Sequence, residues 1–137
     1  MQKNSIKNAI STLPAVIVVV DDDQAVRNSL KFSLEIEGFA VRTYQGPQEL
    51  LAESELPQQG CLILDYKLPG MSGLQLLAKL RDRKVYLPAL LITTHPSLAV
   101  YEEASRAGAQ VIEKPLLGEA LLNGIRQAIE RQQTHSN

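Results

Sequence analysis

Three carboxylates stand directly after two short apolar runs of the chain. Asp21 and Asp22 follow the run from residue 16 to 20, and Asp65 follows the run from residue 61 to 64. Runs of valine, isoleucine and leucine are typical of strands buried on both faces of a parallel sheet. Because such strands place their carboxyl ends at one edge, we expect the three acids to meet in one crevice. Clustered carboxylates repel one another, which favours a hard cation, and we predict magnesium.

Two further polar side chains are predicted at the same edge. Thr93 ends the run Ala89–Thr93, and Lys114 lies between the run Gln110–Glu113 and Pro115. With the three acids they form a set suited to phosphoryl transfer: a carboxylate nucleophile, a metal, a lysine that neutralises charge and a hydroxyl that donates a hydrogen bond. Because an acyl phosphate is a high-energy linkage, such a domain can store a signal instead of completing a metabolic reaction.

Five strand-like runs alternate with five helical patterns, which predicts an α/β fold with a doubly wound parallel sheet. The strands are expected at residues 16–20, 39–44, 61–65, 89–93 and 110–113. The helices are expected from Asp23 to Gly38, from Pro47 to Leu56, from about Ser72, from Ser97 to Ala107 and up to Arg131. The third helix should bury Leu74, Leu77, Ala78 and Leu80, and the fourth has only a thin apolar stripe of Val100, Ala104 and Ala107. Asp23 is interpreted as the N-cap of the first helix.

Length and composition indicate one domain. We expect it at residues 15–131, after a helical or disordered leader at 1–14 and before a polar tail at 132–137. A net charge of −1 gives no basic footprint, so direct nucleic-acid binding is not expected. The single Cys61 allows no internal disulfide, and no apolar run is long enough for a membrane helix, so we expect a soluble cytoplasmic protein.

Several short strings occur in a fixed order along the chain. They are Val19-Val20-Asp21-Asp22, Leu64-Asp65, Leu68-Pro69-Gly70-Met71-Ser72-Gly73, Leu91-Ile92-Thr93, Ala107-Gly108-Ala109 and Glu113-Lys114-Pro115. Each string alone is a weak signal, but the complete ordered set is highly specific. Over about residues 14 to 131 the chain resembles the CheY-like receiver domain of response regulators in bacterial two-component signalling. The resemblance implies a flavodoxin-like sheet of order 2-1-3-4-5, and the string Ile92-Thr93-Thr94-His95 resembles the FixJ-like subgroup.

The resemblance implies a role for each acid of the crevice. Asp65 matches the phosphoacceptor, which takes its phosphoryl group from a phosphohistidine on a sensor histidine kinase or phosphotransfer protein. Asp22 and Asp65 match direct Mg²⁺ ligands, and Lys67 matches the position that offers its backbone carbonyl. Asp21 matches the acid that acts through water.

The resemblance also covers the switch, with two departures. Thr93 matches the switch hydroxyl, and Lys114 matches the lysine that pairs with the phosphoryl group, followed by a cis peptide to Pro115. Val111 stands where the family normally has an aromatic residue, which puts the usual aromatic coupling in question. Thr94 stands where many relatives have a smaller residue, and we predict altered autodephosphorylation.

The expected partners are a kinase or phosphotransfer protein and a downstream protein or effector domain. The latter would contact the fourth helix, the fifth strand and the last helix, and homodimerisation on activation is left open. The domain is expected to assist its own phosphorylation without being an enzyme in its own right. One alternative is an interaction module that works without phosphorylation. Another is a phosphohydrolase, but Lys67 occupies the position where that class needs a second aspartate.

Overall fold

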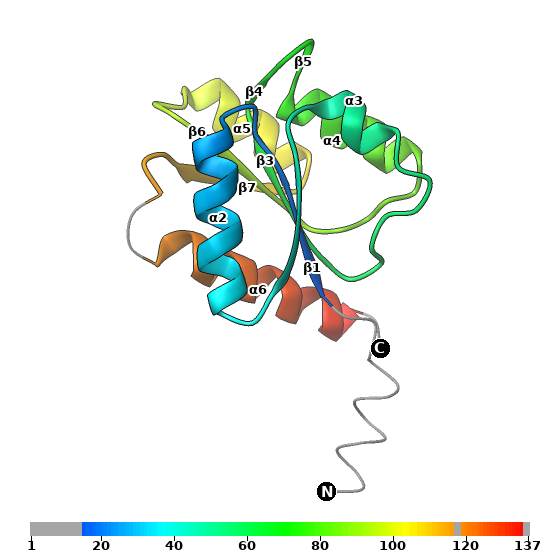
Figure 1. Ribbon diagram of the computed structural model, residues 1–137. Helices are drawn as coiled ribbons and strands as arrows, with labels where there is room; N and C mark the ends of the chain where they lie inside the picture. Colours follow the sequence, from blue (N-terminus) through cyan, green and yellow to red (C-terminus); the bar gives the residue numbers. More distant parts are fainter. Residues whose placement is uncertain (1–14, 117–118, 136–137) are drawn as a thin grey trace, which may run out of the picture.

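The computed structural model describes residues 15–116 and 119–135, so the expected leader at 1–14 lies outside the described residues. Its centre is a parallel sheet of five strands in the order β2-β1-β3-β6-β7, as predicted (Figure 1). The strands are β1 (Val16–Val20), β2 (Ala40–Tyr44), β3 (Gly60–Asp65), β6 (Ala89–Thr93) and β7 (Ala109–Glu113). The helices are α2 (Gln24–Ile36), α3 (Pro47–Leu51), α4 (Gly73–Asp82), α5 (Leu98–Arg106) and α6 (Ala120–His135).

Helices cover both faces of the sheet, and each face has its own apolar core (Figure 1). Side chains alternate between the faces along each strand. Val18 and Leu62 pack with α3, α4 and α5, whereas Ile17 and Ile63 pack with α2 and α6. All four side chains are fully buried, and burial of one such side chain stabilises a fold by about 1.5–3 kcal/mol. The two cores therefore hold the strand ends, and the polar residues that follow them, in fixed positions.

Side chains define where the helices begin. The Asp23 carboxylate accepts hydrogen bonds from the N–H groups of Ala25 and Val26, which confirms Asp23 as the N-cap of α2. Ser72 and Gln75 form a reciprocal capping box at the start of α4. These caps lie at the carboxyl edge of the sheet and fix the loops that leave β1 and β3.

Two predictions about the helices that follow β2 and β3 were wrong. Helix α3 ends at Leu51 and not at Leu56. Residues 52–55 are all exposed, so no apolar contact favours a longer helix. In α4, Leu74, Leu77 and Leu80 are buried as predicted, but Ala78 is exposed, and Leu76, which was not predicted to face inward, is buried.

Other differences concern the termini of the elements and one small hairpin. Helix α6 continues to His135, beyond the predicted end at Arg131. The Gln132 side chain accepts a hydrogen bond from the N–H of Gly60 and donates one to the carbonyl of Gln58, which fastens this last turn to the start of β3. After β3 the chain forms an antiparallel hairpin of β4 (Lys67–Leu68) and β5 (Met71–Ser72), which was not predicted. In α5 only Ala104 is fully buried, so the thin stripe is confirmed, although Ala107 lies outside it.

Candidate functional site

Asp21, Asp22 and Asp65 meet at the carboxyl edge of the adjacent strands β1 and β3. Each offers one carboxylate oxygen, and these oxygens all lie within 4.8 Å of one another. The Asp21 side chain is fully buried and that of Asp65 is 10% exposed, while Asp22 is exposed. Three hard oxygen donors, partly open to solvent, are the donor set that Mg²⁺ prefers. The residues present therefore fit a magnesium site.

Every polar group of Asp21 has a partner, and the partners come from different elements. Its N–H donates to the Tyr44 carbonyl at 3.2 Å, and its Oδ1 accepts from the Asp23 N–H at 2.9 Å. Its Oδ2 lies 3.3 Å from Lys114 Nζ, and its carbonyl accepts from the Arg27 guanidinium at 2.7 Å. A buried carboxylate held in this way is rigid, because any rotation would break a buried hydrogen bond.

Lys114, which follows β7 directly, connects this strand to two of the acids. Its Nζ lies 3.3 Å from Asp21 Oδ2 and 3.3 Å from Asp65 Oδ2. Its backbone N–H donates to the Thr93 carbonyl at 2.8 Å, which ties the end of β7 to the end of β6. The peptide between Lys114 and Pro115 is cis, as the resemblance implied. One ammonium group therefore faces two carboxylates of the cluster.

The charges of the cluster shift two pKa values. Burial raises the pKa of Asp65, and the negative charge of Asp21 raises it further; Lys114 opposes both effects and does not outweigh them. Burial acts to lower the pKa of Lys114, but the charges of Asp65 and Asp21 dominate and raise it. Lys114 therefore stays cationic at neutral pH. The ionised Asp65 carboxylate destabilises the fold, and a bound cation would reduce this destabilisation.

The loop after Asp65 is held close to the site by a glycine. A Cβ on Gly73 would lie 2.4 Å from the Asp65 carbonyl oxygen, so only glycine lets α4 start at this point. The Gly73 N–H donates to the Tyr66 carbonyl at 2.8 Å. The Lys67 N–H donates weakly to Asp65 Oδ1 at 3.4 Å, and the Lys67 side chain is exposed.

The residues predicted to form the switch lie on or next to the following two strands of the sheet, β6 and β7. The side chain of Thr93 is buried at the end of β6, and Thr94 is exposed beside it. Val111 is half-buried in β7, in register with Leu91, and packs against the core below α5. Val111 therefore lies in the sheet, two residues before the edge at which the acids meet.

Two contacts near the site were missed by the sequence analysis. The Arg27 hydrogen bond to the Asp21 carbonyl is one, and a hydrogen bond of 2.8 Å from the Tyr101 hydroxyl to Glu113 is the other. The second joins α5 to the residue directly before Lys114. No periodic pattern could have shown either contact, because each depends on how a helix packs against the edge of the sheet.

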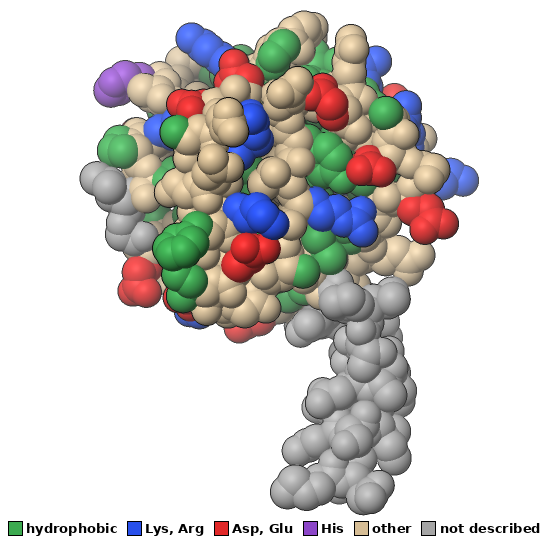
Figure 2. Space-filling view, in the orientation of Figure 1, with side chains coloured by type: hydrophobic (Ala, Val, Ile, Leu, Met, Phe, Trp, Pro, Cys, Tyr) green, Lys and Arg blue, Asp and Glu red, His purple; other side chains and the backbone are tan. Residues whose placement is uncertain are grey.

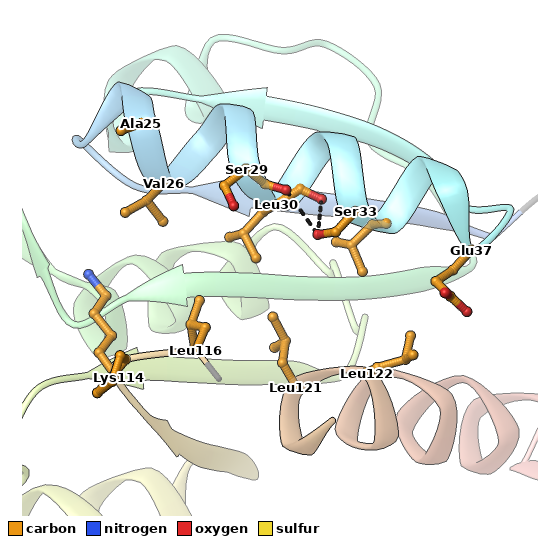
Figure 3. Close-up of a pocket in the computed structure, with 12 residues that line it drawn as sticks. Ala25, Val26, Ser29, Leu30, Ser33, Glu37, Lys114, Leu116, Leu121 and Leu122 are labelled. Carbon is orange, nitrogen blue, oxygen red and sulfur yellow. Dashed lines mark hydrogen bonds between the residues drawn. The ribbon is translucent and has the colours of Figure 1, made fainter. Parts of the chain in front are cut away.

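An apolar groove of about 480 Å³ lies beside the site, between α2 and the start of α6 (Figure 3). Leu30, Leu121 and Leu122 line it, with Lys114 at one end and Glu37 at the other. None of the three acids lines this groove. The acid cluster therefore lies at the edge of the sheet, outside this groove.

The molecular surface carries mixed charge. Acidic and basic side chains are interspersed over the face shown in Figure 2, and no continuous basic patch covers the described residues of that face. No helix within residues 15–116 and 119–135 is long and apolar enough to cross a membrane. The surface agrees with the low net charge of the sequence.

Known proteins are similar to this chain in sequence and in fold. The family model "Response regulator receiver domain" matches residues 17–126. The transcriptional regulatory protein FixJ of Rhizobium meliloti (strain 1021) is 39% identical over 113 residues, which is 82% of this chain and 55% of FixJ. The C4-dicarboxylate transport transcriptional regulatory protein DctD of Pseudomonas aeruginosa is 32% identical over 115 residues, which is 83% of this chain and 25% of DctD.

Solved structures of receiver domains have the same fold as this chain. A CheY-like response regulator receiver domain protein from Methanospirillum hungatei JF-1 superposes with a TM-score of 0.80 at 32% identity, covering 89% of this chain and 98% of that one. The structure of FixJ-N gives a TM-score of 0.77 at 38% identity, covering 85% and 94%. The chain belongs to the response regulator receiver domain family and is FixJ-like in sequence. It spans about half the length of FixJ and a quarter of DctD.

Proposed function

We propose that the chain is a phosphorylation-dependent switch of a two-component phosphorelay, with Asp65 as the phosphoacceptor. The observation that carries the proposal is the position of Asp65, which lies at the end of a central strand with two other carboxylates and the Lys114 ammonium close to it. The phosphoryl donor is a phosphohistidine of a sensor histidine kinase or phosphotransfer protein.

The transfer is a substitution at phosphorus. An oxygen of the Asp65 carboxylate attacks, the new O–P bond forms, and the P–N bond to the donor imidazole breaks, leaving its electron pair on nitrogen. Lys114, 3.3 Å from Asp65 Oδ2, offers positive charge where the phosphoryl oxygens arrive. The chain supplies no second carboxylate at Lys67, which argues against a phosphohydrolase.

Magnesium is the cofactor that fits this donor set. Asp22, Asp65 and the Lys67 carbonyl would hold it directly, and Asp21 through water. When bound, it neutralises charge on the transferred phosphoryl group. The buried Asp21 carboxylate, with hydrogen bonds to Asp23 and Lys114, and the Lys114 ammonium, which also contacts Asp65, then keep the site in place during the reaction.

The phosphorylated state would be read through Thr93 and Lys114, whose backbones are already joined at the sheet edge. We propose that a downstream protein or effector domain contacts the surface of α5, β7 and α6, in the cytoplasm, and that activated chains form homodimers there.

Thr94, exposed beside Thr93, would control access of water and so the lifetime of the acyl phosphate. Val111, in place of an aromatic residue, favours the alternative function, in which the receiver domain binds its partner without phosphorylation.

The site of phosphorylation can be located directly. After incubation with Mg²⁺ and acetyl phosphate, borohydride reduction converts an aspartyl phosphate to homoserine, and peptide mass spectrometry shows which aspartate was modified. We expect homoserine at position 65. Modification at Asp21 or Asp22 with position 65 untouched would refute the assignment.

A further inference from the structure

We propose that Arg27 is a positioning residue of the metal site, which orients Asp22 by holding the peptide that joins it to Asp21. The inference rests on the proposed function, because it concerns how well the acid cluster binds Mg²⁺. Within the described part of the chain, no hydrogen bond or ion pair joins Arg27 to Asp65 or Lys114. Its place is one helical turn after the acids, on α2.

Arg27 is bonded to the acidic turn twice. Its guanidinium donates to the Asp21 carbonyl at 2.7 Å, a short charge-assisted hydrogen bond. Its backbone N–H donates to the Asp23 carbonyl at 3.0 Å, the first helical bond of α2. The helix and the acidic turn are therefore locked together by one residue.

The bonded carbonyl belongs to the peptide plane that ends at the Asp22 nitrogen. Because a peptide unit is planar, fixing the Asp21 oxygen fixes the direction in which the chain enters Asp22. Among the described residues, nothing donates a hydrogen bond to the Asp22 carboxylate, and no cation pairs with it. The side chain is exposed. The direction of this side chain therefore depends on the backbone on either side of Asp22. The Arg27 guanidinium holds the peptide before Asp22, and the Asp21 carboxylate holds the peptide after it.

Among the described residues, the one hydrogen-bond partner of the Arg27 guanidinium is the Asp21 carbonyl. No carboxylate pairs with Arg27 in the part of the chain that the structure describes. Groups that orient metal ligands from outside typically change metal affinity by about 10–100-fold when they are removed. Loss of Arg27 should therefore weaken Mg²⁺ binding even though Asp21, Asp22 and Asp65 are all present.

The chain offers a matched control in Arg81. Its guanidinium also donates to backbone carbonyls, those of Val85 and Leu87, at 2.9 and 2.7 Å. These carbonyls lie in the loop before β6, at the opposite edge of the sheet from the acids. Loss of Arg81 should lower stability without changing the metal site, which separates a positioning role from a merely structural one.

The test measures Mg²⁺ affinity without phosphorylation, from thermal unfolding of the full chain over a series of MgCl₂ concentrations. A loss of stability shifts the unfolding temperature in EDTA, whereas a loss of affinity shifts the MgCl₂ concentration at which stabilisation begins. The proteins are wild type, Arg27→Gln, Arg27→Lys, Arg81→Gln and Asp22→Asn. We expect Arg27→Gln to bind about tenfold more weakly, Arg81→Gln to bind as wild type, and Arg27→Lys to recover part of the affinity.

Each other outcome overturns the proposal. Unchanged affinity in Arg27→Gln, with affinity lost in Asp22→Asn, would remove the positioning role and leave the metal site intact. Equal weakening in Arg81→Gln would make the effect one of general stability. No stabilisation of the wild type by Mg²⁺ would overturn both this inference and the proposed metal site. If Arg27→Gln does not fold, Arg27→Lys compared with Arg81→Lys decides the same question.

Discussion

Replacing Asp65 by asparagine should stabilise the metal-free protein. The pKa of Asp65 is raised on folding, so the fold disfavours its charged form. Such a group contributes stability below its unfolded pKa of about 3.9 and loses that contribution as the pH rises through the folded value. At pH 7 the ionised carboxylate therefore costs stability, and a neutral amide of the same shape removes the cost.

The size of the effect follows from the distances in the cluster. At an effective dielectric constant of about 20, two unit charges 4.8 Å apart repel by about 3.5 kcal/mol, and charges 3.3 Å apart attract by about 5 kcal/mol. Asp65 faces two like charges, one of them exposed and screened, and the single opposite charge of Lys114. With the burial of Asp65 added, we expect asparagine to raise the free energy of unfolding by about 1–2 kcal/mol.

Magnesium should reverse the order of stability. At a concentration of 100 times its dissociation constant, a ligand stabilises the folded state by about 2.7 kcal/mol. Wild type should gain this amount, and Asp65→Asn, which lacks one of the three carboxylates, should gain less.

The assay is urea unfolding at pH 7 in EDTA and again in MgCl₂, with Glu102→Gln as an exposed control for the same change of charge. The reasoning would be refuted if Asp65→Asn were less stable than wild type in EDTA. It would also be refuted if Mg²⁺ stabilised both proteins equally, or if Glu102→Gln behaved as Asp65→Asn does.

Three further substitutions test the packing and the chemistry. Gly73→Ala places a Cβ 2.4 Å from the Asp65 carbonyl and should destabilise by about 1–3 kcal/mol in urea unfolding, whereas Gly46→Ala, whose Cβ would meet the flexible Glu49 side chain at 3.3 Å and Pro69 at an ordinary 3.9 Å, should change little. Gly124→Ala lies within α6, where its Cβ would make ordinary contacts of 3.4 Å or more with Leu90 and Ile112, so thermal unfolding should show a gain of about 0.5–1 kcal/mol; a loss would show that the added methyl group does not fit between these side chains. Thr94→Ala should change the half-life of the acyl phosphate, followed by the decay of the phosphorylated mass, and an unchanged half-life would remove Thr94 from the site.

Much of the fold could be predicted from the sequence because strongly apolar runs allow few structures. The run at residues 16–20 is buried at every position in β1, and the acids that follow it lie at the carboxyl edge, as expected. The end of α2 was marked by Gly38, which has a φ of 98°. These features are local, since each depends on a residue type that suits one backbone conformation.

The errors arose where local patterns compete with packing. Ala78 fits the apolar spacing of α4, but in the folded chain Ala78 is exposed and Leu76 is buried. The last turn of α6 is polar in sequence and is held by Gln132, whose partners lie more than 70 residues away. The role of Arg27 was not predicted for the same reason. An arginine on an amphipathic helix is usually solvated, and only the folded chain brings its guanidinium to the Asp21 carbonyl.

The central claim is that Asp65 accepts a phosphoryl group with the help of a bound divalent cation. The most direct test is intact-mass analysis after incubation with Mg²⁺ and acetyl phosphate, beside an Asp65→Asn variant and a chelated sample. We predict one phosphoryl adduct on the wild type and none in either control. A folded wild type that gains no adduct, or an adduct that persists in Asp65→Asn, would contradict the account.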